Sequence, residues 1–226
     1  MKWFVLGNGY SLNVTPLEKI KGFNSIGMNG IHKFYDRTTW RPSVYVNIDH
    51  NVYVDWKYRC KLHLDMGIPC YLWSALKDGH PDGHPNHDIL PDGIGNYPNA
   101  VWVDRCEHTI YRYPNPKAAQ EWHLPRICTG FSKISAAIQI AYLRGATEIF
   151  LLGCDLGITE SNNHMVEDYL PEKCHAQEYT TKQELNMLAA HLLAKKSCPV
   201  PIYNCTVGGK LEVYPRMELK DAVRNN

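Results

Sequence analysis

Short apolar runs that end in glycine, asparagine or aspartate recur along this chain, and they constrain its fold more than any other feature. Residues 3–6 end at Gly7, and residues 148–152 lead into Gly153-Cys154-Asp155. Similar strand-like runs occupy residues 23–28, 43–48, 70–73, 100–103 and 201–205. Continuous apolar runs of this length are typical of strands that are buried on both faces. They predict a mostly parallel sheet.

Helical patterns lie between these runs, as parallel connections require. They are a short helix from about Ser11, an amphipathic helix over 51–66, a strong helix from Thr129-Gly130 to Gly145, and a helix over 179–196. For the last helix we predict an apolar face made of Leu185, Leu188, Leu192 and Leu193. Alternating strands and helices predict a doubly wound, Rossmann-like α/β fold, in which ligands bind beyond the carboxyl ends of the strands.

The length of 226 residues fits one nucleotide-binding α/β domain over 1–226. Two loop-rich insertions, about 77–125 and 156–178, are expected to form a lid. In the first, His80, His84 and His87 alternate with aspartates in the pattern of a metal cluster. The dense Gly, Pro and Asp residues there favour a solvated loop, so we predict no metal site.

The charges are nearly balanced, with 24 Lys and Arg against 23 Asp and Glu. This removes the usual argument for nucleic-acid binding, although a local basic patch would still allow it. No apolar run is long enough for a membrane span, and the run before Gly7 is too short for a signal peptide. Eight scattered cysteines without a CxxC motif fit reduced thiols. We expect a cytoplasmic protein, with a homo-oligomer left open.

The turn after the first strand, Gly7-Asn8-Gly9-Tyr10-Ser11-Leu12, is a candidate phosphate site. Glycines allow backbone amides to approach a phosphate, and Ser11 is placed to cap the next helix. Leu12 breaks the GxGxxG pattern, so the dinucleotide fingerprint is absent. A tight turn with an ordinary helix cap is an equally good interpretation.

Polar residues also follow the second and third strands, where Asn29, Asn47 and Asp49 stand. Since parallel strands end at one edge of the sheet, the two amides are expected near a nucleotide base or ribose. Asparagine is also common in ordinary turns. Asp49 could hold Mg²⁺ together with phosphates, or cap a helix.

Further candidates lie in the second half of the chain. The residues that could clamp a phosphate or carboxylate before the strong helix are Arg126, Thr129 and Gly130. A threonine cap beside a surface arginine is the alternative there. Asp155 ends a buried strand, a position that often carries catalytic groups. His164 and His175 follow it and are candidate general bases.

In order and spacing, these segments resemble the bacterial sialyltransferases that act on lipooligosaccharide. The matching motifs are Gly7 to Leu12, Met28-Asn29, Val46-Asn47, Arg126 to Gly130 and Gly153-Cys154-Asp155. The resemblance covers about residues 1–50 and 125–200. It implies transfer of a sugar from a CMP-type nucleotide-sugar donor to a hydroxyl acceptor, with no cofactor required.

The resemblance also implies roles for individual residues. Asn8, Asn29 and Asn47 would contact the nucleotide, and Arg126 and Thr129-Gly130 would lie near the donor or acceptor. His175 would be the base, with His164 as second choice. Gly157 and Asn163 replace two tyrosines that support the leaving phosphate in that family, and Tyr169 is the candidate substitute.

The tail of the chain resembles a second group, the domain (domain of unknown function 115) that includes archaeal 6-hydroxymethylpterin diphosphokinases. The matching segments are Asn204 to Gly209 and a proline-started helix over Pro215 to Leu219. This resemblance implies Mg-ATP-dependent diphosphate transfer, with Asp49 and Asp155 holding the Mg²⁺. A non-catalytic nucleotide-binding protein is the third hypothesis, and the glycosyltransferase is the one we favour.

Overall fold

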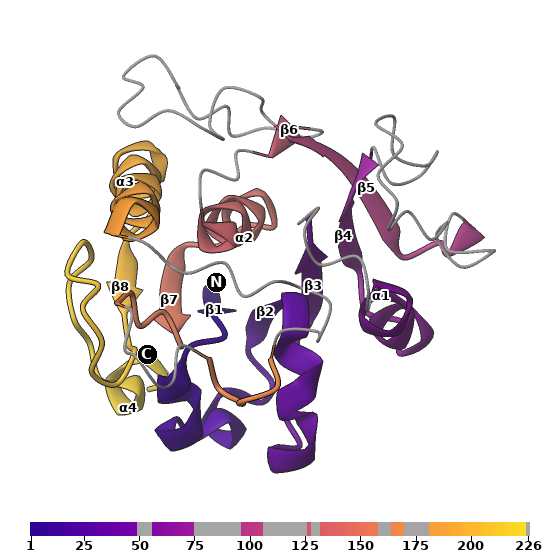
Figure 1. Ribbon diagram of the computed structural model, residues 1–226, viewed down its shortest axis with the longest axis horizontal. Helices are drawn as coiled ribbons and strands as arrows, with labels where there is room; N and C mark the ends of the chain where they lie inside the picture. Colours follow the sequence, from indigo (N-terminus) through magenta and orange to yellow (C-terminus); the bar gives the residue numbers. More distant parts are fainter. Residues whose placement is uncertain are drawn as a thin grey trace.

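The computed structural model describes residues 1–48, 56–74, 96–105, 126–127, 132–157, 164–169 and 181–224. Within these ranges eight strands, all parallel, form one sheet in the order β6-β5-β4-β3-β2-β1-β7-β8 (Figure 1). The strands are β1 Lys2–Leu6, β2 Asn24–Met28, β3 Val44–Asn47, β4 Cys70–Trp73, β5 Ala100–Arg105, β6 Arg126–Ile127, β7 Glu148–Leu152 and β8 Ile202–Asn204. The predicted Rossmann-like α/β sheet is confirmed.

The strand order reverses at β1. The chain builds β2 to β6 on one side of β1 and then returns to add β7 and β8 on the other side. β1 pairs with β7 from Lys2↔Glu148 to Leu6↔Leu152, so the turns that follow these two strands begin side by side. Open α/β sheets bind ligands at such a switch point, beyond the carboxyl ends of the strands.

Helices cover both faces of the sheet (Figure 1). One face carries α2 Lys133–Leu143 and α3 Thr181–Ser197. The other face carries the 3₁₀ helices η1 Tyr10–Val14, η2 Leu17–Ile20 and η3 Asn29–Arg37, together with α1 Trp56–Asp65 and α4 Leu219–Ala222. Two hydrophobic cores result, one on each side of the sheet.

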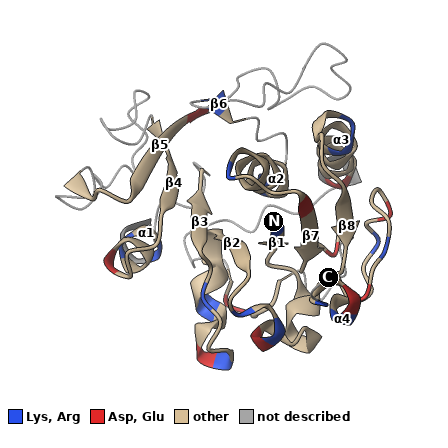
Figure 2. Cartoon of the chain, turned by 180° about the vertical axis from the view of Figure 1, so that it is seen from behind, with Lys and Arg blue, Asp and Glu red and all other residues tan. Residues whose placement is uncertain are grey.

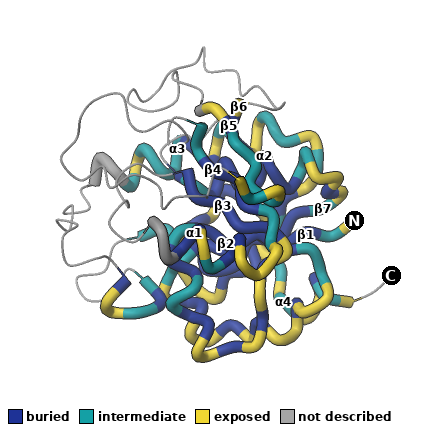
Figure 3. The backbone as a smooth tube through the Cα atoms, turned by 90° about the vertical axis from the view of Figure 1, so that its right-hand side faces the viewer, coloured by how far each residue is buried: buried dark blue, intermediate teal, exposed yellow. Residues whose placement is uncertain are grey.

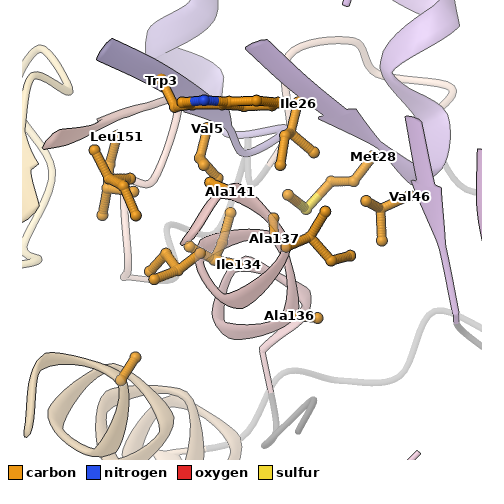
Figure 4. Packing of buried hydrophobic residues seen from close by; sticks show 14 of the residues in the cluster. Trp3, Val5, Ile26, Met28, Val46, Ile134, Ala136, Ala137, Ala141 and Leu151 are labelled. Atoms are coloured by element: carbon orange, nitrogen blue, oxygen red, sulfur yellow. The ribbon is translucent and has the colours of Figure 1, made fainter. Parts of the chain in front are cut away.

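Strand alternation divides the side chains between these cores. In β1, Trp3 and Val5 face α2, whereas Phe4 and Leu6 face the 3₁₀ helices. Figure 4 shows the first core, where the small residues Ala137 and Ala141 of α2 lie among the strand side chains. Figure 3 shows the strands among the most buried parts of the backbone. The sheet is therefore a rigid platform for the turns at its edge.

The helices differ from the sequence expectation in two respects. The α2 N-cap is Ser132, whose hydroxyl accepts a hydrogen bond from Ile134 N at 3.3 Å, so the helix starts after the predicted Thr129-Gly130. The predicted apolar face of α3 is wrong in part. Leu188 packs against the core, but Leu185 and Leu192 are 50% and 48% exposed, and the most buried side is made of Ala190, His191 and Ala194. Small residues on this side allow α2 to approach closely, and the Ser135 hydroxyl of α2 donates to the Ala190 carbonyl at 3.3 Å.

Charged side chains lie mainly on the helices and turns at the surface, and the strands carry few of them (Figure 2). No helix in the described part of the chain is long and apolar enough to cross a membrane. The described cysteines are free thiols, buried except for the half-buried Cys198. Most of the predicted lid insertions, including His80, His84 and His87, lies outside the described residues.

Candidate functional site

The glycine turn after β1 packs directly on the turn after β7. Gly7 N donates to the Leu152 carbonyl at 2.8 Å, and Gly9 N donates to the Gly153 carbonyl at 2.9 Å. A Cβ atom at Gly7 would lie 2.3 Å from the Gly153 carbonyl oxygen, and one at Gly9 would lie 2.2 Å from Asp155 Oδ2. Close approach of the two turns therefore requires glycine at both positions.

Asp155 holds the start of η1. Its Oδ2 accepts a hydrogen bond from Ser11 N at 3.0 Å, while the N-cap residue Gly9 contributes no side-chain cap. The prediction that Ser11 caps this helix is wrong, because the carboxylate of Asp155 supplies the acceptor from another strand. The amides of Gly7, Gly9 and Ser11 all donate within the protein. These three amides are therefore engaged within the protein, and the phosphate role expected of this turn stays a prediction.

A third turn, after β8, reaches the same point. Lys210 N donates to the Asp155 carbonyl at 2.6 Å, and a Cβ at Gly209 would lie 2.5 Å from that carbonyl oxygen. The guanidinium group of Arg216 holds this turn by donating to the carbonyls of Thr206, Gly208 and Gly209. Three turns at the carboxyl edge of the sheet, those after β1, β7 and β8, therefore converge on Asp155.

The predicted helix over Pro215 to Leu219 is displaced in the structure. Asn204 N donates to the Pro215 carbonyl at 2.8 Å, and Arg216 forms a parallel bridge with Asn204. α4 starts only at Leu219. The tail segment therefore runs beside β8 before α4 begins. The buried Asn204 side chain also holds the tail, since its Nδ2 donates to the Leu211 carbonyl at 2.8 Å.

Tyr169 joins the ends of β1 and β2. Its hydroxyl accepts hydrogen bonds from Asn8 Nδ2 at 2.6 Å and from Gly30 N at 3.3 Å. A Cβ at Gly30 would lie 2.6 Å from the Tyr169 ring, so the buried tyrosine requires glycine there. Met165 N also donates to the Asn8 carbonyl at 3.0 Å. These contacts fix segment 164–169 against the sheet edge and bring Tyr169, the proposed substitute tyrosine, to the site.

His164 belongs to the same segment. Its ring stacks on Tyr169 with centroids 4.0 Å apart and an interplanar angle of 20°. Burial lowers the pKa of His164, and a hydrogen bond to the backbone of Asn8 opposes part of that effect. The lowered pKa favours the neutral imidazole at neutral pH, the form that can accept a proton. His175, the other candidate base, lies outside the described residues.

Four buried side-chain oxygens at this edge have no hydrogen-bond partner among the described residues: Asn8 Oδ1, Ser11 Oγ, Asn29 Oδ1 and Asp155 Oδ1. The orientation of the Asn8 amide is fixed, because its Nδ2 lies 3.0 Å from the Met28 carbonyl, which can only accept. Buried acceptors normally have partners, and each unpaired one is costly. A ligand that brings O–H or N–H groups to this edge would satisfy them.

The backbone is also strained here. Among the described non-glycine residues, those with positive φ are Asn29, at +47°, and Leu156, at +40°. They follow β2 and β7, the strands that flank β1. Asparagine tolerates this conformation, whereas leucine adopts it rarely. Such strain persists where the surrounding structure enforces it, and it clusters at functional sites.

Two predicted site residues lie elsewhere. The side chain of Asn47 is fully buried, with Nδ2 3.5 Å from the Tyr45 hydroxyl and 3.7 Å from Cys60 Sγ. Strand alternation sends it into the core on the Tyr45 side. Arg126 lies in β6, five strand spacings or roughly 24 Å from β1. Asp49, Thr129 and Gly130 lie outside the described residues.

The magnesium pair Asp49 and Asp155 stays a prediction, because Asp49 lies outside the described residues. The described ends of β3 and β7 are three strand spacings apart, roughly 14 Å. Asp155 already uses Oδ2 to accept from Ser11 N. Within the described residues, no group of three or more His, Cys, Asp or Glu could hold a metal ion.

Sequence reasoning did not single out Gly30, Lys210 and Arg216. Gly30 follows Asn29 at a strand end, and Lys210 follows the Gly208-Gly209 turn after the last strand. Because all strands of a parallel sheet end at one edge, this placement alone could have marked both residues. No sequence pattern around Arg216 indicates its role, which depends on how the segment after β8 folds back onto the turn.

A comparison with protein-family models finds no match, and no curated protein matches the sequence significantly. Among solved structures, the fold matches that of MAf glycosyltransferase from Magnetospirillum magneticum AMB-1, with a TM-score of 0.55 and 14% sequence identity. The match covers 96% of this chain and 33% of that chain, so this chain spans about a third of its length. The likeness shows a glycosyltransferase-like α/β fold. Both family resemblances drawn from the sequence stay predictions.

Proposed function

We propose that this protein transfers a glycosyl group from a nucleotide-activated donor to a hydroxyl acceptor, and that the donor binds at the carboxyl ends of β1, β2 and β7. The observation that carries the proposal is the pair of buried amide oxygens, Asn8 Oδ1 and Asn29 Oδ1, which have no partner among the described residues and lie just after the neighbouring strands β1 and β2. Ribose hydroxyls or an exocyclic base amine are donors that would pair with them. The shared fold with a glycosyltransferase supports this choice.

The resemblance to sialyltransferases favours a cytidine nucleotide, whose exocyclic amine offers two N–H donors to acceptor oxygens. In the reaction the acceptor hydroxyl oxygen attacks the anomeric carbon of the sugar, and its proton passes to a histidine. The bond between that carbon and the phosphate oxygen breaks, and its electron pair leaves with the nucleotide. Such a displacement balances without a metal or an oxidant.

His164 is the base that the described residues support. Its neutral imidazole is favoured by burial, and its stacking on Tyr169 ties it to Asn8. General-base catalysis contributes about 10²- to 10⁴-fold to rate. We expect His164→Gln to bind the nucleotide as tightly as the native protein and to hydrolyse or transfer the donor at least about 100-fold more slowly. If His175→Gln alone has this effect, the base is His175.

Calorimetry with CMP, CDP, UDP, GDP, ADP and ATP, each with and without Mg²⁺, tests the proposal. We expect CMP or CDP to bind without metal, and Asn29→Ala to abolish binding. Asn24→Ala is the matched control, because Asn24 opens the same strand at the opposite edge of the sheet. Binding of ATP alone, and only with Mg²⁺, would favour the diphosphokinase. A protein that binds none of these nucleotides would contradict the proposal.

A further inference from the structure

The three turns that converge on Asp155 carry few charges. Residues 7–12, 153–157 and 205–210 contain one carboxylate, Asp155, and one cation, Lys210. The amides of Gly7, Gly9 and Ser11 already donate within the protein. η1 has only five residues, so its dipole is small. A phosphate bound among these turns therefore needs a cationic side chain.

Lys210 is fixed along its length toward the turn after β7. Its backbone N donates to the carbonyls of Asp155 and Leu156, at 2.6 and 3.1 Å. Its aliphatic stem crosses Gly157, where a Cβ would lie 2.8 Å from Lys210 Cδ and 3.3 Å from Cε. Gly157 has φ +128°, a conformation that excludes other residues. The glycine thus provides both the backbone path and the space for the lysine stem.

The ammonium group of Lys210 forms no ion pair and no side-chain hydrogen bond with the described parts of the chain. Other cations near this edge are occupied. Lys33 pairs with Asp168 at 3.2 Å, and Arg216 pairs with Glu212 at 2.6 Å while it binds the turn carbonyls. Lys210 is held in place by contacts that leave its charge available to a ligand.

We propose that Lys210 binds the phosphate of the nucleotide donor and stabilises the negative charge that grows on it as the sugar departs. This inference rests on the proposed function and adds a residue that neither family resemblance assigned. A charge-assisted hydrogen bond from an ammonium to a phosphate oxygen is short and strong. It strengthens in the transition state, because charge develops on the leaving oxygen. Arg216 acts as a positioning residue that fixes the turn carrying Lys210.

The test compares nucleosides with their monophosphates on the full chain. Calorimetry measures the Kd of cytidine and CMP, and of the uridine, adenosine and guanosine pairs, for the native protein and for Lys210→Met and Lys210→Arg. Methionine keeps the stem over Gly157 and removes the charge. We expect Lys210→Met to weaken monophosphate binding by about 10- to 100-fold and to leave nucleoside binding unchanged. Lys210→Arg should restore most of the loss.

Lys220→Met is the matched control, since Lys220 is exposed on α4 and pairs with Glu218 at 2.6 Å. It should leave both constants unchanged. Native monophosphate affinity in Lys210→Met would overturn this inference and leave the proposed function intact. Weaker binding of both the nucleoside and the monophosphate would also overturn this inference, because Lys210 would then maintain the conformation of the turn rather than bind the phosphate. If the native protein binds no nucleotide, the proposed function fails first.

Discussion

Two polar regions of this molecule differ in how the hydrogen bonds of their central residues, His63 and Asp155, are paired. The first lies under α1, where the buried His63 ring binds the Tyr35 hydroxyl at 2.6 Å through Nε2 and the Arg59 carbonyl through Nδ1. The same ring stacks on Tyr45, with centroids 3.7 Å apart. The second region is the edge around Asp155, where four buried side-chain oxygens have no hydrogen-bond partner among the described residues. Pairing at both ring nitrogens is typical of a structural histidine, and unpaired oxygens beside strained backbone are typical of a ligand site.

The two regions meet at Asn29. The Tyr45 hydroxyl of the α1 region donates to the Asn29 carbonyl at 2.7 Å. That bond helps to hold Asn29 at positive φ, with its side-chain oxygen unpaired. The α1 region therefore supports the strained residue that we propose for ligand binding. Changes in the first region should affect stability, and changes in the second should affect binding.

Among the changes that we predict, lowering the pH should have the largest effect on the free energy of unfolding. Burial lowers the pKa of both His63 and His191 to about 4, against an ordinary value of 6.5. The unfolded chain then binds more protons than the folded chain between these values, so stability is full above pH 6.5 and is lost as the pH falls toward 4. Each histidine should remove about 3 kcal/mol from the free energy of unfolding over that interval. Urea unfolding at pH 7.5 and at pH 4.5 measures this loss.

Three neighbouring groups also act on the pKa of His63: the hydrogen bond to the Arg59 carbonyl raises it, whereas the charges of His32 and Arg41 lower it. His191 faces the Tyr214 hydroxyl at 3.2 Å. His191→Gln should flatten the dependence on pH by about half. A free energy of unfolding that stays constant from pH 7.5 to 4.5 would contradict the assignment of buried neutral histidines.

The substitution Gly9→Ala should have the next largest effect on the free energy of unfolding. Gly9 has an ordinary φ of −72°, so the cost comes from the clash of the new Cβ with Asp155 and Gly153. We expect a loss of about 3 kcal/mol, as for overpacking. Gly67→Ala is the matched control, because Gly67 has φ +73° and open space around it, and should lose only about 1 kcal/mol. Equal losses in thermal or urea unfolding would show that the turns can separate.

The sheet could be predicted from the sequence because its strands are marked locally. Most of the buried runs are apolar and stop at a glycine or polar residue, as at Gly7 and Gly153, whereas the two-residue strand β6 carries no such pattern. The buried face of α3 could not be predicted in the same way. Its leucines dominate the hydrophobic pattern, yet close packing on α2 selects the smaller Ala190 and Ala194.

The site was predictable only in part. Strand ends marked Asn8, Asn29 and Asp155, since the edge of a parallel sheet follows from the strand order. Their partners are remote, because Ser11 binds Asp155 across 144 residues and Asn8 binds Tyr169 across 161. The burial of Asn47, by contrast, follows from the sequence. Asn47 stands two residues after Tyr45, and strand periodicity places it on the same buried face.

The same chemical change in the two regions should give different outcomes. Tyr35→Phe removes the partner of His63 Nε2 and should cost about 1–2 kcal/mol of stability, with no change in nucleotide affinity. Tyr169→Phe removes the acceptor for Asn8 and Gly30, and should weaken nucleotide binding at a similar cost in stability. Unfolding and calorimetry on both variants test this. If Tyr35→Phe weakens binding as much as Tyr169→Phe, the two regions are not separate in function.

Asn29→Gly should have the smallest effect on stability. It therefore separates an effect on ligand binding from an effect on stability most clearly. Glycine adopts the φ of +47° without strain, and its substitution removes an unpaired buried oxygen. The free energy of unfolding should stay unchanged or rise by up to about 1 kcal/mol, while nucleotide binding is lost. Asn99→Ala provides the opposite case, because its amide binds the carbonyls of Leu64 and Ile68 at 3.1 and 2.9 Å. That variant should lose stability and keep binding, so a stable Asn29→Gly protein that still binds nucleotide would remove Asn29 from the site.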